Sequence, residues 1–333
     1  KGCKTKRDFQ SKVIYPVVNM VLDNKITDLN GAGIDSISKN DTHLYISNHR
    51  DIVLDAALLN ILLFSEGLDT TEIAIGDNLL IYPWIEKVVR LNKSFIVKRG
   101  VSVRQKLEAS QQLSDYIHDT IVRRKQSVWM AQREGRAKDS DDKTQTSLLK
   151  MLTLHDRKNP IETLKLLNIR PLSISYEYDP CDFLKAKEFQ LKRDNPEYIK
   201  SKSDDIENML NGIMGFKGGV NFKLGNPVNK FIDDIPADTP RTELLQKVAD
   251  IIDREIYVNY KFFSINYVAY DMMTGNNSFS NNYTKEDVHN FEDYLNRQLS
   301  NIHIENKDDA FLKEQMIKMY GNTVKNYMAV TGE

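Results

Sequence analysis

Short apolar runs alternate with longer amphipathic runs through the middle of the chain. The short runs are typical of strands and occupy residues 43–47, 72–76, 94–98, 127–132, 170–177 and 219–224. Between them, apolar residues recur at helical spacing over 52–65, 78–91, 103–125 and 148–154. Strands separated by helices predict an α/β fold with a mixed, largely parallel sheet flanked by helices.

The pattern changes at both ends of this region. An N-terminal amphipathic helix is expected within residues 9–22. Pro236 and Pro240 mark a break, beyond which helical spacing returns over 242–260, 285–299 and 308–328. We therefore expect an N-terminal helical segment (residues 1–35), an α/β domain (36–236) and a helical C-terminal region (237–333).

Composition narrows the class of protein. The 333 residues are 41% hydrophobic and 28% charged, which is ordinary for a globular protein with a full core. Lys and Arg number 46 against 47 Asp and Glu, whereas a protein that wraps nucleic acid is usually far more basic. Two cysteines, Cys3 and Cys181, exclude a disulfide scaffold and a four-cysteine zinc site. No nucleic-acid partner and no metal are therefore expected.

Hydropathy bears on location. No apolar run approaches the roughly 20 residues of a membrane-spanning helix, and the N-terminus has no clean signal-peptide pattern. Two unpaired cysteines fit a reducing compartment. We expect a cytoplasmic protein.

A histidine after the strand at 43–47 is the first candidate for chemistry. His49 would lie between the carboxyl end of a strand and the N-terminus of a helix, where open α/β sheets place their sites. Asp51 and Asp55 follow it. A carboxylate bonded to one ring nitrogen would fix the tautomer and leave the other nitrogen as a general base. The alternative is that Asp51 caps the helix and His49 is a polar loop residue.

Three further features stand at strand ends. Lys98 and Arg99 end the strand at 94–98 before a basic helix, which indicates either an anion seat or a solvated helix face. After the strand at 127–132 come Glu134, Gly135 and Arg136, either a polar site with a tight glycine turn or a plain surface turn. Pro171 near the start of its strand suits an edge strand or a first residue.

In this order, these blocks resemble the acyltransferase family that acylates glycerol 3-phosphate and 1-acylglycerol 3-phosphate in phospholipid synthesis. That family shows an N-H-x-x-x-x-D block, an F-I-x-R-R-like block, an E-G-x-R block and a strand that begins with Pro. The corresponding segments here are 49–55, 95–99, 134–136 and 171–177, and 219–228 is similar to the family's closing strand. The resemblance covers about residues 40–230.

Two positions depart from the family's pattern. The family's Asp lies five residues after the His, where this chain has Leu54. Either the helix starts one residue later, which brings Asp55 to the imidazole, or Asp51 takes the role; we favour Asp55. Arg136 follows Gly135 directly, without the usual intervening residue, so the resemblance is firmer for Glu134 and Gly135 than for Arg136.

The resemblance implies an O-acyltransferase that uses acyl-CoA or acyl-ACP as co-substrate and needs no other cofactor. His49 would be the general base, supported by Asp55 or Asp51. Lys98 and Arg99 would bind the phosphate of the acceptor. The remaining substrate-binding candidates are Glu134, Gly135, Arg136 and Pro171. The alternatives are an acyl thioesterase and an inactive peripheral lipid-binding protein.

The lipid product raises the question of membrane contact. The N-terminal helix carries Val13, Val17, Met20 and Val21 along one side, with basic residues before it, as interfacial helices do. An aromatic stretch over 257–270 is a second candidate. For both, the alternative is packing on the α/β domain. We expect peripheral contact with the inner face of the membrane, without a crossing.

Overall fold

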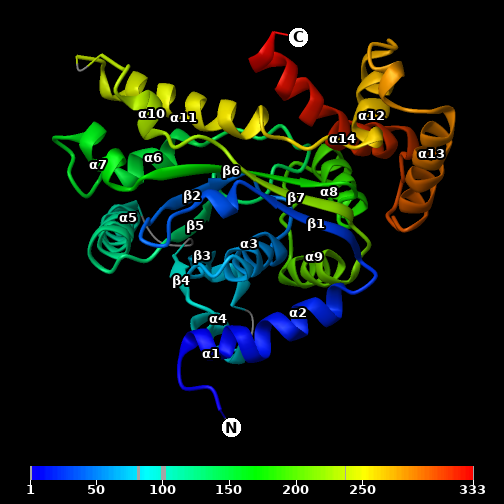
Figure 1. Cartoon of the computed structure of the whole chain (residues 1–333). Coiled ribbons are helices and arrows are strands. Elements are labelled where there is room, and N and C mark those ends of the chain that lie inside the picture. The colour runs from blue at the N-terminus through cyan, green and yellow to red at the C-terminus, as the bar shows by residue number, and fades with distance from the viewer. Residues whose placement is uncertain (1, 81–82, 99–102, 237, 333) are drawn as a thin grey trace.

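A single seven-stranded sheet lies at the centre of the molecule (Figure 1). The computed structural model describes residues 2–80, 83–98, 103–236 and 238–332. The strands are β1 (Ile26–Ala32), β2 (Leu44–Ser47), β3 (Glu72–Gly76), β4 (Ser94–Val97), β5 (Val128–Ala131), β6 (Ile169–Tyr176) and β7 (Gly218–Leu224). Their spatial order is β1-β7-β6-β2-β5-β3-β4, and β6 and β7 form the antiparallel pair in an otherwise parallel sheet. The predicted mixed, largely parallel sheet is confirmed.

Helices cover both faces of this sheet (Figure 1). Before β5 they are α1 (Lys6–Phe9), α2 (Tyr15–Leu22), α3 (Leu54–Ser65), α4 (Pro83–Leu91) and α5 (Val103–His118). Between β5 and β7 they are α6 (Thr146–Leu152), α7 (Pro160–Leu166), α8 (Asp182–Asp194) and α9 (Lys202–Met214). After β7 follow α10 (Asn229–Ile232), α11 (Arg241–Tyr257), α12 (Ser264–Thr274), α13 (Lys285–Ser300) and α14 (Asp309–Thr331). The predicted N-terminal helix and helical C-terminal region are confirmed; the first is α1 and α2 joined by a π-helical turn, Gln10–Ile14.

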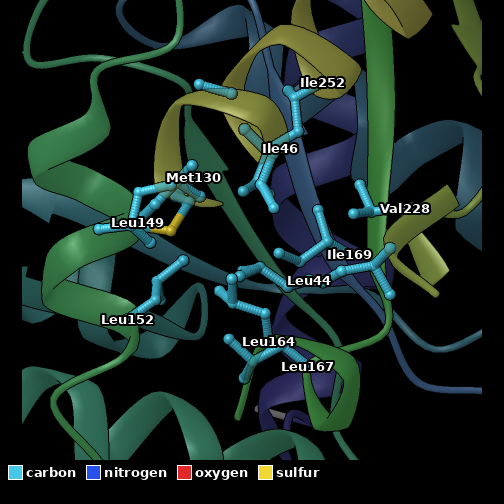
Figure 2. Close-up of a cluster of buried hydrophobic side chains, with 14 of the residues drawn as sticks. Leu44, Ile46, Met130, Leu149, Leu152, Leu164, Leu167, Ile169, Val228 and Ile252 are labelled. Carbon is cyan, nitrogen blue, oxygen red and sulfur yellow. The ribbon is translucent and has the colours of Figure 1, made fainter. Parts of the chain in front are cut away.

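The central strand β2 is buried on both of its faces. Leu44 and Ile46 point into a core under α6, α7 and α11, which Figure 2 shows closing around these two side chains. Tyr45 points the other way, into a second core with α3. Successive side chains of a strand alternate between faces, so a strand with helices on both sides needs apolar residues throughout. This explains why the run at 43–47 could be predicted from hydrophobicity alone.

The position of Pro171 differs from expectation. It is the third residue of β6 and pairs in register with Ile46, and β6 lies between β2 and β7. The expectation of an edge strand or a first residue is therefore wrong. The carbonyl of Pro171 accepts a hydrogen bond from the Gly225 N–H at 2.9 Å, where the β6–β7 pairing begins. The missing proline N–H thus falls at the end of a ladder, where it disturbs least.

Several elements were not predicted. β1 lies within the segment expected to be helical only, and it forms an edge of the sheet with a polar, half-exposed sequence. Two of the unpredicted helices, α8 and α9, form the connection from β6 to β7. The C-terminal helices α12 to α14 pack with α8 around a third core, while α11 covers the sheet. Tyr257 and Tyr260 of the aromatic stretch are buried in the core below α11.

Candidate functional site

The imidazole of His49 is bonded to the carboxylate of Asp55. Nδ1 lies 2.8 Å from Oδ2, at the carboxyl end of β2. The His49 side chain is 13% exposed, whereas Asp55 is fully buried in the first turn of α3. A carboxylate at Nδ1 favours the tautomer with a proton on that nitrogen, which leaves the lone pair on Nε2. This arrangement leaves a base at the one ring nitrogen that Asp55 does not use.

The same oxygen of Asp55 also organises the loop between β2 and α3. Oδ2 accepts the backbone N–H of Arg50 at 2.7 Å and that of Asp51 at 3.1 Å, besides the contact with His49. Three contacts on one oxygen fix the direction of the carboxylate. The loop geometry and the imidazole contact are therefore set by one atom.

Asp51 holds a different position. Its Oδ1 accepts the N–H groups of Val53 at 2.8 Å and Leu54 at 2.7 Å, and so caps the start of α3. Burial and the neighbouring Asp55 raise the pKa of Asp51 above its ordinary value. α3 begins at Leu54, so Asp55 lies in its first turn, where its carboxylate reaches His49.

Neighbouring strands fix the residues around His49. The side-chain amide of Asn48 donates to the Ile174 carbonyl and accepts the Ile174 N–H, both at 2.8 Å. The indole N–H of Trp129 donates to Ser47 Oγ at 3.1 Å, and its ring meets the His49 ring edge-on, with centroids 5.8 Å apart. The loop is thus tied to β6 on one side and to β5 on the other.

The other predicted residues differ in whether they lie at the same edge of the sheet as His49. The carboxyl ends of the parallel strands β2, β5 and β4 share one edge of the sheet, so Lys98 and the turn after β5 lie on the same side as His49. Lys98 is exposed, and Arg99 lies outside the described residues. Pro171 is buried within β6 and is not at this edge.

The turn after β5 needs its glycine. Gly135 has a φ of 70°, in the left-handed region that side chains disfavour. Glu134 is exposed, and its N–H donates to Gln145 Oε1 at 2.8 Å. Arg136 turns inward and donates to Asn208 Oδ1 on α9 at 2.7 Å. The turn thus presents Glu134 to solvent and fastens Arg136 to α9.

Two residues near the centre escaped the sequence analysis. Tyr176 on β6 is buried, and burial together with Asp55 and Asp51 raises the pKa of its hydroxyl. Arg50 is 5% exposed and lies 2.7 Å (Nη2 to Oδ2) from Asp142. Both residues lie inside blocks of the resemblance, 49–55 and 171–177, but at positions whose residue type those patterns leave open. Within the described parts of the chain, no group of three or more His, Cys, Asp or Glu side chains could hold a metal ion.

In comparisons with known proteins, one segment of the chain matches a family. Residues 29–155 match the family described as Acyltransferase. Among solved structures, the chain is similar to the crystal structure of the 1-acyl-sn-glycerophosphate (LPA) acyltransferase PlsC from Thermotoga maritima. That likeness has 14% sequence identity and a TM-score of 0.40, and it covers 76% of this chain and 82% of the other. No curated protein matches the chain.

The contact between α9 and Asp51 gives a first prediction. A Cβ added at Gly212 would collide with the Asp51 carboxylate. Gly212→Ala should therefore lower the free energy of unfolding by about 1–3 kcal/mol, although alanine normally stabilises a helix interior by about 0.5–1 kcal/mol. Urea unfolding of both single variants and the double variant measures this. In the Asp51→Ala background the cost should vanish; an equal cost in both backgrounds would contradict the contact.

Proposed function

We propose that this chain transfers a fatty acyl group to a glycerol phosphate, because residues 29–155 match the family described as Acyltransferase. The donor is an acyl thioester, acyl-CoA or acyl-ACP. The acceptor is the hydroxyl of glycerol 3-phosphate or of 1-acylglycerol 3-phosphate. The observation that carries the proposal is the 2.8 Å contact between His49 Nδ1 and Asp55, in which the imidazole remains partly exposed.

In the proposed reaction, His49 acts as a general base through Nε2. The acceptor hydroxyl gives its proton to Nε2 while its oxygen attacks the thioester carbonyl. Asp55 stabilises the imidazolium that forms, as the carboxylates of His-dependent hydrolases do. The tetrahedral intermediate then collapses, the C–S bond breaks, and the thiolate takes the proton from the imidazolium. The acyl group passes directly to the acceptor, without an acyl-enzyme.

The acceptor subsite is proposed at the strand ends beside His49. Lys98, exposed after β4, and Arg99 would bind the phosphate, since charge-assisted bonds to phosphate are among the stronger polar contacts. Glu134 and Gly135 at the turn after β5 would line the glycerol part. Arg136 would support this turn without contacting the acceptor, because its side chain is hydrogen-bonded to Asn208.

An inactive lipid-binding protein is the alternative that a displaced aspartate would favour, because the catalytic pair would then be broken. Asp55 Oδ2 lies 2.8 Å from the imidazole despite the extra residue, so the spacing does not favour that reading. A thioesterase would use the same His49 and Asp55 to activate water. Dependence of thiol release on the acceptor distinguishes transfer from hydrolysis.

Removal of the base gives the second prediction. His49→Ala should lower acceptor-dependent thiol release from acyl-CoA or acyl-ACP by about 10²–10⁴-fold, the usual contribution of a general base. Circular dichroism and thermal unfolding check that the variant is folded, because a partly exposed side chain should tolerate truncation. A folded variant that keeps more than about a tenth of the wild-type rate would refute the role of His49.

The two aspartates give the third prediction. Asp55→Asn removes the carboxylate that faces the imidazole, so kcat should fall more than in Asp51→Asn, which keeps an oxygen able to cap α3. The two changes have the same size and both positions are buried, so each is the control for the other. A larger loss of kcat in Asp51→Asn would assign the acid to Asp51.

We also propose that the protein works against a lipid surface. Helices α2 and α9 are neighbours (Figure 1). Each carries exposed apolar side chains, Val17 and Met20 on α2 and Leu210 and Met214 on α9. Exposed Lys4 and Lys6 precede α2, which favours anionic headgroups. No described helix is both long enough and apolar enough to cross a membrane.

The lipid contact gives the fourth prediction. Met20→Asp with Met214→Asp should weaken co-sedimentation with vesicles of phosphatidylglycerol and phosphatidylcholine, and added salt should weaken it further. Leu166→Asp is the matched control, because Leu166 is as exposed (54%) as Met214 (55%) but lies on α7. If wild-type protein stays in the supernatant at low salt, or if the control loses binding equally, the lipid-facing surface is wrong.

A further inference from the structure

The side chain of Arg50, the residue after His49, is buried against an aspartate from a distant loop. Nη1 donates to Asp142 Oδ1 at 3.1 Å, and Nη2 lies 2.7 Å from Oδ2. The two side chains are 5% and 1% exposed. Because water is excluded, removal of either partner would leave a buried charge without compensation.

Two tyrosines from the C-terminal region hold Asp142 in turn. The Tyr260 hydroxyl donates to Asp142 Oδ2 at 2.8 Å, and the Tyr257 hydroxyl donates to the carbonyl of Asp142. The Arg50 guanidinium also lies over the Tyr260 ring, 5.9 Å from its centroid. A continuous chain of contacts therefore runs from the end of α11 to the residue next to His49.

This chain reaches the atom that orients the imidazole. The backbone N–H of Arg50 donates to Asp55 Oδ2 at 2.7 Å, and that oxygen contacts His49. Arg50 is thus fixed at its side chain by Asp142 and at its backbone by Asp55. This double attachment restricts the movement of the loop that carries His49.

A buried ion pair is a weak source of net stability, because desolvation offsets most of the attraction. Its better attested effect is to select one arrangement among several. Here the ion pair selects one arrangement of the loop that carries His49. A small displacement of a catalytic group has a large effect on rate.

We infer that Asp142 and Tyr260 are positioning residues, through which the C-terminal region holds the loop of His49 in its reactive geometry. They touch no substrate and act through Arg50. This inference rests on the proposed acyl transfer for its kinetic readout, but the geometry that it predicts can be measured without substrate.

Tyr260→Phe is the most direct test, because it keeps the ring and removes only the hydroxyl that holds Asp142. We expect kcat to fall by about tenfold, with the KM of donor and acceptor within about twofold of wild type. The matched control is Tyr283→Phe, which also removes a tyrosine hydroxyl from an aspartate in the C-terminal region, 2.8 Å from Asp271. The control should keep the wild-type kcat.

A second readout needs no activity. The proton between His49 Nδ1 and Asp55 should give a downfield NMR signal, to be assigned by its loss in His49→Ala. This signal should shift or broaden in Tyr260→Phe and stay in place in Tyr283→Phe. If wild-type protein shows no transfer, the proposed function fails, and the NMR comparison alone decides the positioning role.

Two results would overturn the inference. In the first, Tyr260→Phe leaves both kcat and the NMR signal unchanged. In the second, Tyr260→Phe and Tyr283→Phe lower kcat alike and in proportion to their loss of thermal stability, which would mean a merely structural role. If Asp142→Asn folds, it should lower kcat at least as far as Tyr260→Phe.

Discussion

One oxygen atom holds the site together. Asp55 Oδ2 accepts from His49 Nδ1 and from the backbone N–H groups of Arg50 and Asp51, so a single buried carboxylate sets both the tautomer of the base and the path of its loop. Burying a carboxylate is costly unless it is hydrogen-bonded, and these three contacts satisfy Oδ2. The sheet fixes the position of this loop, because β2, which precedes it, is packed on both of its faces.

Several elements of the fold contact the loop that this oxygen organises. β5 and β6 hold the neighbouring residues through Trp129 and Asn48, and α9 approaches Asp51 so closely that only glycine fits at position 212. The C-terminal region lies outside the segment, 29–155, that matches the family. It contacts the loop through Asp142. Tyr257 and Tyr260, far along the chain, thus connect through Asp142 and Arg50 to the loop of the residue that we propose as the base.

The sequence predicted the parts of the fold that hydrophobicity alone dictates. β2 is apolar throughout because both faces are buried, whereas β1 has polar residues on an open edge and was missed within the segment predicted to be helical. The His49–Asp55 contact was one of two alternatives, since spacing could not decide where α3 begins. The role of Asp142 could not be predicted, because it lies in a charged run typical of a solvent-exposed loop. Its partner Arg50 is 92 residues away in the sequence.

The most direct test is to identify the product that wild-type protein makes from a labelled acyl thioester and glycerol 3-phosphate or 1-acylglycerol 3-phosphate. Mass spectrometry of the lipid fraction and titration of released thiol are measured in the same reaction. We predict one acyl ester of the acceptor for each thiol released, and no release without acceptor. Free fatty acid in place of the ester, formed equally without acceptor, would contradict acyl transfer.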